Sequence, residues 1–331
     1  MQLFLLGAGF DADAAGEAGP IYGNSIYVGS YRIDCSYPTL ADVAGLCFGL
    51  DNVLVDKSIE EMFADAIEQG NYDPLRKLYE RIMEADFRLA WRLSSPEHPS
   101  CYREFFESFS ESTFITFNYD SLPEIFLHRL HRWYPHDGYG VPVETETMAG
   151  AMIVEFPKST SLVLHLHGSF CVYTMENEII DGAPGAISWL QPLATPRYLF
   201  DPDSISMCFP LYRRSMSRTG YISIEERVIA PVPGKATQLQ APFIMTTYER
   251  ACLLIRESGN LIAIGYSFNR HDGASYGPLL EALSSSPDKS LVIVSPQATE
   301  AAEQITHEYR ALRVKSIDKT FNTWAQDSFR Y

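Results

Sequence analysis

The 331-residue sequence contains no C-x-x-C pair, and its few cysteines are far apart. This spacing excludes a zinc ribbon and a paired redox dithiol, both of which need two neighbouring sulfur ligands. We therefore expect buried free thiols and no bound metal. The six cysteines are Cys35, Cys47, Cys101, Cys171, Cys208 and Cys252.

The sequence also lacks an excess of positive charge and any long apolar run. It has 42 acidic and 26 basic residues, which gives a formal charge of -16. Such a balance repels phosphate backbones and anionic lipid surfaces. No run approaches the roughly 20 apolar residues of a membrane span, and no positive flank of a secretion signal is present. These absences predict a cytoplasmic protein with no direct nucleic-acid or membrane partner.

Buried strands that alternate with helices are the main pattern of the sequence. Apolar runs predict strands over 2–6, 113–120, 161–169, 260–267 and 289–296. In the C-terminal part, periodicity predicts helices over 246–258, 277–284 and 299–312. Alternating strands and helices favour a parallel sheet with right-handed crossovers. The predicted fold class is therefore α/β, a Rossmann-like parallel sheet without a zinc ribbon.

Two segments interrupt this alternation within a single predicted domain over 1–331. Helical spacing over 39–50, 58–92 and 102–109 predicts an inserted helical module, and the proline- and glycine-rich segment 172–240 predicts an irregular insertion. We divide the chain accordingly into a first strand with its nucleotide loop, the helical module, the central strands, the irregular insertion and a C-terminal Rossmann half. These parts cover residues 1–38, 39–112, 113–171, 172–240 and 241–331.

A glycine-rich turn follows the first strand directly. The segment GAGFDA at 7–12 fits the dinucleotide-binding fingerprint in its Gly/Ala form. Glycine and proline residues between 16 and 20 predict an early break of the next helix, which disfavours a standard dehydrogenase. That alternative would use SIYVGSYRID at 25–34 as its second strand and Asp34 as the ribose acid. A glycine turn without a ligand is a further alternative.

Polar residues end four of the apolar runs abruptly. The segments are GAGFD, TFNYD at 116–120, LHGS at 166–169 and GYSFNRHD at 265–272. In this order and spacing they resemble the motifs of the sirtuin-like family. With no cysteine pair to hold zinc, the chain is most similar to the prokaryotic zinc-free branch, which hydrolyses NAD in antiphage defence. The resemblance implies a homo-oligomer or a complex with a partner protein such as an ATPase or a sensor.

The resemblance implies an NAD glycohydrolase that releases nicotinamide and ADP-ribose. It assigns Asn118 to the nicotinamide ribose and the attacking water, Asp120 to the carboxamide, and His167 to the general base. Imidazole suits that task because its ordinary pKa lies near neutrality. The residues that it implies for binding NAD, as substrate and without a metal, are Gly7, Ala8, Gly9, Phe10, Asp11, Thr116, Gly265 and Ser267.

The residues also leave other interpretations of the function and of single roles open. Asp11 stands where the family usually has serine, and an anion beside the ligand phosphates favours a non-catalytic sensor or scaffold that binds NAD or ADP-ribose. An NAD-dependent deacylase or ADP-ribosyltransferase is a third possibility. Asn118 could also satisfy turn backbone only. His165 precedes His167 by two residues, so strand alternation predicts that both side chains face the same side.

Overall fold

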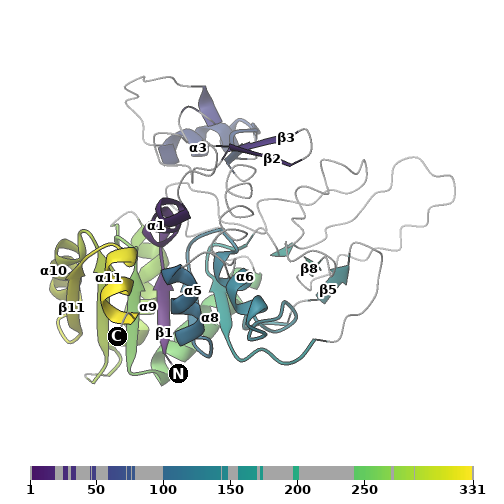
Figure 1. The fold of residues 1–331 in the computed structure, drawn as a ribbon. Coiled ribbons are helices and arrows are strands. Elements are labelled where there is room, and N and C mark those ends of the chain that lie inside the picture. Colours follow the sequence, from purple (N-terminus) through teal and green to yellow (C-terminus); the bar gives the residue numbers. More distant parts are fainter. Residues whose placement is uncertain are drawn as a thin grey trace.

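Figure 1 shows the computed structural model of the chain. The predicted helix over 39–50 is described only at 45 and 47–49, the predicted helix over 58–92 not beyond residue 78, and the insertion 172–240 only at its strand residues. The structure describes residues 2–18, 25–28, 31–34, 45, 47–49, 59–71, 73–75, 77–78, 100–142, 144–147, 156–169, 172–173, 197–200, 242–269, 272–286 and 288–329.

A six-stranded sheet forms the centre of the molecule, with every strand pairing in parallel. Its order is β11-β10-β9-β1-β4-β6. The chain therefore builds outward from β1 on one side and returns to build outward on the other, which is the doubly wound order of a Rossmann-like sheet. The strands are β1 (Leu3–Leu6), β4 (Thr113–Thr116), β6 (Leu162–His165), β9 (Asn260–Ile264), β10 (Ser290–Ser295) and β11 (Arg313–Asp318).

Helices cover both faces of the sheet, which explains why its inner strands are continuously apolar. Phe4 and Leu6 of β1 pack with α5, α6 and α11 on one face, and Leu3 and Leu5 pack with α8, α9 and α10 on the other. Figure 1 shows α5 and α11 in front of the sheet and α8 and α9 behind it. These helices are α5 (Cys101–Ser108), α6 (Leu122–Arg129), α8 (Pro242–Glu257), α9 (Gly273–Ser284), α10 (Ala298–Glu308) and α11 (Phe321–Phe329).

The glycine turn leads into a helix, contrary to the early break that the sequence predicted. Helix α1 (Ala8–Ala18) has 11 residues and continues through Gly16. A glycine inside a helix costs only about 1 kcal/mol relative to alanine, so one is tolerated. Gly19 and Pro20, on which the predicted break also rested, lie outside the described residues. The Asp13 carboxylate accepts hydrogen bonds from the Phe321 and Asn322 backbone N–H groups, which fastens α1 to α11.

The two strands of the segment 25–34 pair apart from the central sheet, which contradicts the dehydrogenase alternative. Strands β2 (Ser25–Val28) and β3 (Tyr31–Asp34) run antiparallel and, among the described strands, pair with each other alone. The strand beside β1 that follows it in the chain is β4 instead. Asp34 therefore does not follow a strand of the central sheet, where a ribose-binding acid would have to stand.

The predicted inserted module and the predicted irregular insertion are described in part. Helix α3 (Ile59–Glu68) falls within the first. In the second, β7 and β8 pair with β5, which precedes the insertion in the chain, in a three-stranded sheet of order β5-β8-β7 that the sequence did not predict. These strands are β5 (Glu144–Thr147), β7 (Val172–Tyr173) and β8 (Arg197–Phe200). Within the described ranges, no helix is long and apolar enough to cross a bilayer.

Candidate functional site

The four polar strand ends predicted from the sequence meet at one edge of the sheet. Leu6, the last residue of β1, is in register with Thr116 of β4 and Ile264 of β9, and Thr116 is in register with His165 of β6. The residues that follow these strands therefore lie side by side at the carboxyl edge. Because β1 is flanked by β4 and β9, this edge includes the point where the strand order reverses, the usual ligand crevice of such sheets.

The turn after β1 packs tightly against the turn after β9. Gly7 N–H donates to the Ile264 carbonyl and Gly9 N–H to the Gly265 carbonyl, both at 2.9 Å. A Cβ on Gly265 would lie 2.2 Å from the Phe10 nitrogen, and one on Gly7 would lie 2.6 Å from the Gly265 oxygen. The glycines thus permit backbone contact between two strand ends. The N–H groups that we expected to bind pyrophosphate are occupied at Gly7 and Gly9, whereas Ala8 is exposed.

The next two residues of the predicted binding loop point into the protein. Phe10 is fully buried, with its ring centroid 4.8 Å from that of Tyr102 and 4.7 Å from that of Phe321. Asp11 is 2% exposed, and its side chain lies close enough to Asp120 to influence the pKa of that residue. The Asp11 carboxyl therefore does not face the solvent side of the turn, where ligand phosphates would repel it.

Asp120 belongs to a buried acidic group and also caps a helix. It is 1% exposed, and its Oδ2 accepts the Leu122 N–H at 3.0 Å, at the start of α6. Burial and the nearby Glu124 charge raise the pKa of Asp120 to about 6, although the His165 charge, the Asp11 side chain and the Leu122 N–H oppose the rise. Asp120 therefore keeps its proton to a higher pH than an exposed aspartate does.

Glu124 and His165 form a fully buried pair behind this acidic group. His165 Nε2 lies 2.6 Å from Glu124 Oε1, and both side chains are 0% exposed. The Tyr139 hydroxyl donates to the same oxygen at 3.3 Å. Burial alone would lower the pKa of His165, but the Glu124 charge and hydrogen bond, helped by Asp120 and the Asn118 carbonyl, raise it overall. The sequence analysis missed Glu124, although an acid within the otherwise apolar LPEIFL helix was a signal for it.

Asn118 is held by its backbone and presents its side chain at the edge. Its N–H donates to Thr116 Oγ1 at 2.9 Å, and its carbonyl lies 3.1 Å from His165 Nδ1. Thr116 Oγ1 also donates to the Leu6 carbonyl at 3.2 Å, which ties the Asn118 loop to the end of β1. The side-chain amide of Asn118 is half-buried and bonds to no residue that the structure describes. Thr116 therefore supports the Asn118 loop.

His167 lies in an aromatic setting on the other side of the edge. It is 4% exposed, its Nε2 lies 3.1 Å from Ser275 Oγ of α9, and its ring centroid is 4.8 Å from that of Phe117. The prediction that His165 and His167 face the same side is wrong. Strand β6 ends at His165, and the chain turns through Leu166 before Gly168 at φ +83°, so strand alternation does not extend to His167.

The end of β9 supplies Tyr266, which packs on Phe117, the aromatic neighbour of His167. Tyr266 stacks on Phe117 with ring centroids 4.9 Å apart and is 7% exposed. Burial and the nearby Asp272 carboxylate raise the pKa of Tyr266 well above its ordinary value. Asp272 is the N-cap residue of α9 but makes no side-chain capping bond. Ser267, predicted to bind NAD, follows Tyr266 and is exposed.

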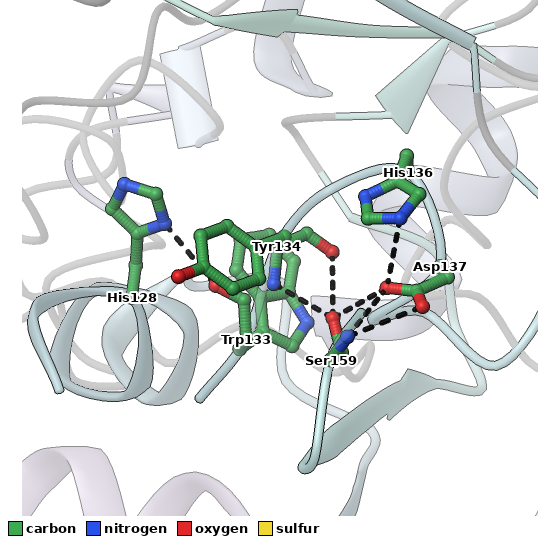
Figure 2. A network of polar contacts seen from close by, with 6 residues as sticks. All are labelled: His128, Trp133, Tyr134, His136, Asp137 and Ser159. Atoms are coloured by element: carbon green, nitrogen blue, oxygen red, sulfur yellow. Dashed lines mark hydrogen bonds and ion pairs between the residues drawn. The ribbon is translucent and has the colours of Figure 1, made fainter. Parts of the chain in front are cut away.

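A serine, a histidine and an aspartate also meet near the amino end of β6, away from this edge (Figure 2). Ser159 Oγ bonds directly to Asp137 and to the Tyr134 carbonyl, while His136 Nε2 lies 3.6 Å from Asp137. A nucleophilic triad needs the imidazole between the hydroxyl and the carboxylate. Here the carboxylate binds the hydroxyl itself, so the cluster fastens a loop and does not activate a nucleophile.

The described part of the chain contains no group of three or more side chains suited to hold a metal ion. Its cysteines Cys47, Cys101 and Cys252 are free and buried, as the sequence predicted. Cys35, Cys171 and Cys208 lie outside the described residues.

No protein-family model matches the chain, and no curated protein matches its sequence. Among solved structures, the chain is similar to a triple mutant of a Sir2 homologue in complex with 2′-O-acetyl ADP-ribose. The two sequences are 13% identical, the match covers 99% of this chain and 90% of that chain, and the TM-score is 0.44. A second similar structure is a Sir2 homologue mutant with ADP-ribose, at 14% identity, the same coverage and a TM-score of 0.43. A third is a Sir2 homologue–NAD complex, at 13% identity, 99% and 88% coverage and a TM-score of 0.42. At this level of similarity, the ligand and chemistry of this chain have to be argued from its own residues.

Proposed function

We propose that the chain binds NAD at the carboxyl edge of the sheet and hydrolyses it to nicotinamide and ADP-ribose. In this reaction the bond between the ribose C1′ and the nicotinamide nitrogen breaks, and its electron pair leaves with the nicotinamide, which becomes neutral. Water adds to C1′ and gives up a proton. The protein has to orient the ribose, accept that proton and stabilise the cationic C1′ centre.

The observation that carries this proposal is the state of Asn118. Its backbone is fixed at both peptide groups, yet its side-chain amide is half-buried and bonds to no described residue. A polar side chain on a fixed backbone that is accessible at the ligand edge is suited to contact a ligand, because its position is set before the ligand binds. We assign this amide to the nicotinamide ribose and the attacking water.

The other roles follow from position along the edge. His167, whose ring packs beside Phe117, is assigned to the general base on water or a ribose hydroxyl. The start of α1 at Ala8 offers an N–H group and the positive end of a helix dipole, which suits a pyrophosphate. Asp120 is assigned to the carboxamide, a role that it would share with its capping of α6. Exposed Ser267 is assigned to the adenosine side.

The direct test is NAD turnover, measured as nicotinamide release by the purified chain, alone and with the products of neighbouring genes. Wild type should release nicotinamide. Asn118→Ala and His167→Ala should each reduce the rate by about 10²–10⁴, the usual contribution of positioned catalytic groups. Ser159→Ala, in the loop cluster of Figure 2, is the matched control and should retain the rate if it folds.

Three other outcomes would replace the proposal. Tight NAD or ADP-ribose binding by calorimetry, with wild type as inert as Asn118→Ala, would identify a sensor or scaffold instead. The inward position of the Asp11 carboxyl removes the reason for which the sequence favoured that alternative. Removal of an acyl group from an acyl-lysine peptide would identify a deacylase, and label transfer from NAD to protein an ADP-ribosyltransferase.

The biological role that we propose is depletion of NAD during phage infection, by an oligomer or a complex with a partner such as an ATPase or sensor. Cells that express the wild-type chain with its neighbouring genes should lose NAD after infection and limit phage yield. Cells with Asn118→Ala should keep their NAD and lose protection. Equal phage yield with both proteins would contradict this role, and the mass of the purified complex would report its assembly.

A further inference from the structure

Asn118 depends on two side chains for the position of its backbone. Thr116 Oγ1 accepts its N–H at 2.9 Å, and His165 Nδ1 lies 3.1 Å from its carbonyl oxygen. A carbonyl can only accept, so Nδ1 must carry a hydrogen and donate it. Thr116 and His165 are paired residues at the ends of neighbouring strands. The Asn118 peptide groups are thus fastened to β4 on one side and to β6 on the other.

The His165 ring is itself fixed at its second nitrogen. Nε2 lies 2.6 Å from Glu124 Oε1, which also accepts the Tyr139 hydroxyl at 3.3 Å. With both nitrogens bonded and the side chain fully buried, the ring has one orientation. A carboxylate that orients a histidine whose other nitrogen acts elsewhere is a recurrent arrangement at functional sites.

We propose that His165, oriented by Glu124, is a positioning residue for Asn118. This inference rests on the proposed NAD hydrolysis and names two residues that act through Asn118 without touching the substrate. His165 Nδ1–H fixes the Asn118 carbonyl, and through it the direction of the side-chain amide at the ligand edge. Small displacements of such a group lower catalytic rates strongly, because reaction requires close alignment.

The location of the Glu124–His165 pair argues against a purely stabilising purpose. A buried ion pair is often no more stabilising than well-packed apolar side chains of similar size. Its neighbours Leu164 and Leu166 are such apolar residues, and both are fully buried. The polar pair stands instead at the end of β6, where it contacts the Asn118 loop. This placement favours a role in fixing that loop.

Two substitutions separate the Asn118 contact from the Glu124 contact. His165→Asn places an amide nitrogen near the position of Nδ1, so it keeps a donor for the Asn118 carbonyl and loses Glu124. His165→Gln places its amide near the position of Nε2, so it keeps Glu124 and loses the Asn118 carbonyl. We expect His165→Gln to lower kcat by roughly ten- to a hundred-fold with little change in KM, and His165→Asn to restore most of the rate.

His128 supplies the matched control on α6. Its Nδ1 lies 3.1 Å from the Trp133 carbonyl, so His128→Gln also removes an imidazole contact to a backbone carbonyl, but far from Asn118 (Figure 2). We expect His128→Gln to keep the wild-type kcat. If His165→Asn and His165→Gln lose kcat equally, or only in proportion to their loss of thermal stability, the positioning role is overturned.

A second measurement does not depend on turnover. In protein labelled with ¹⁵N at asparagine, the Asn118 signals are identified by their loss in Asn118→Ala. His165→Gln should shift or broaden them, and His165→Asn should leave them near their wild-type positions. Equal changes in both variants would refute the positioning role. If wild type cleaves no NAD but this difference holds, the proposed hydrolysis fails and the positioning of Asn118 stands.

Discussion

At the scale of single residues, the candidate site is a set of buried acids behind a presented amide. Asp11 lies near Asp120, whose pKa is raised by burial and by the Glu124 charge, and Glu124 holds His165. None of these carboxyl groups is more than 2% exposed. Negative charge at the edge is therefore withdrawn from the side on which an anionic nucleotide would approach. Asn118 remains as the polar group that the edge offers.

The perturbed pKa of Asp120 predicts a pH-dependent stability. Its pKa rises from 3.8 to about 6 on folding, so between pH 4 and pH 6 the folded state binds more protons than the unfolded state. Stability from this group is therefore present below pH 4 and is lost as the pH rises to 6, by up to about 3 kcal/mol for a two-unit shift.

Asp120→Asn tests this prediction, because asparagine keeps a carbonyl acceptor for the Leu122 N–H but does not ionise. Its free energy of unfolding, relative to wild type, should increase by up to ~3 kcal/mol between pH 4 and pH 7. Urea denaturation at four pH values measures it. A difference between the two proteins that stays constant with pH would contradict the raised pKa.

At the scale of elements, the two glycine turns act as a contact between β1 and β9. Fingerprint glycines are usually explained by the approach of a ligand phosphate. Here Gly7 and Gly265 permit the approach of one strand end to another, with a hydrogen bond from Gly9 N–H across the contact. The sequence motif therefore marked the correct place but predicted only part of its purpose.

Gly265→Ala should be among the most destabilising substitutions in the chain. Its φ of +66° strains any other residue, and the added Cβ would lie 2.2 Å from the Phe10 nitrogen. We expect a loss of more than ~3 kcal/mol, against about 1 kcal/mol for Gly70→Ala, which has a similar φ but open space. Gly259→Ala, with open space and no positive φ, should be nearly neutral.

Urea denaturation of the three variants measures these losses and separates strain from steric conflict. Equal losses in Gly265→Ala and Gly70→Ala would show that the contact between the two turns is not tight. A folded Gly265→Ala should also bind NAD more weakly if the turns line the ligand crevice.

At the scale of the whole molecule, the sequence predicted the sheet better than its surroundings. Strands β1, β4, β6, β9 and β10 are apolar because both faces of a parallel sheet are covered, and this signal is strong. Strand β11 lies at the edge with partly exposed side chains, and α11 is only nine residues long; both were missed. Helix α6 was missed because it begins at Leu122, directly after the polar strand end at Asp120.

The candidate site was predictable only where it follows strands. Asn118, Asp120 and His167 stand at strand ends, and the parallel register brings them together. Their partners Glu124 and Ser275 come from helices, and which residue of a helix reaches the site depends on how that helix packs. Packing of this kind leaves no local pattern in the sequence, so the buried network emerged only from the structure.

The net charge of the whole chain makes a final prediction about salt. A formal charge of -16 implies repulsion across the folded surface, and the ion pairs Arg132–Glu111, Arg313–Asp288 and Lys319–Asp327 are largely exposed. Exposed pairs contribute about 0–1 kcal/mol each, so net repulsion should dominate. Raising NaCl from 0.01 to 0.15 M shortens the screening length from about 30 to about 8 Å. The urea midpoint should therefore rise with salt, whereas a fall would show that attractive ion pairs dominate the surface.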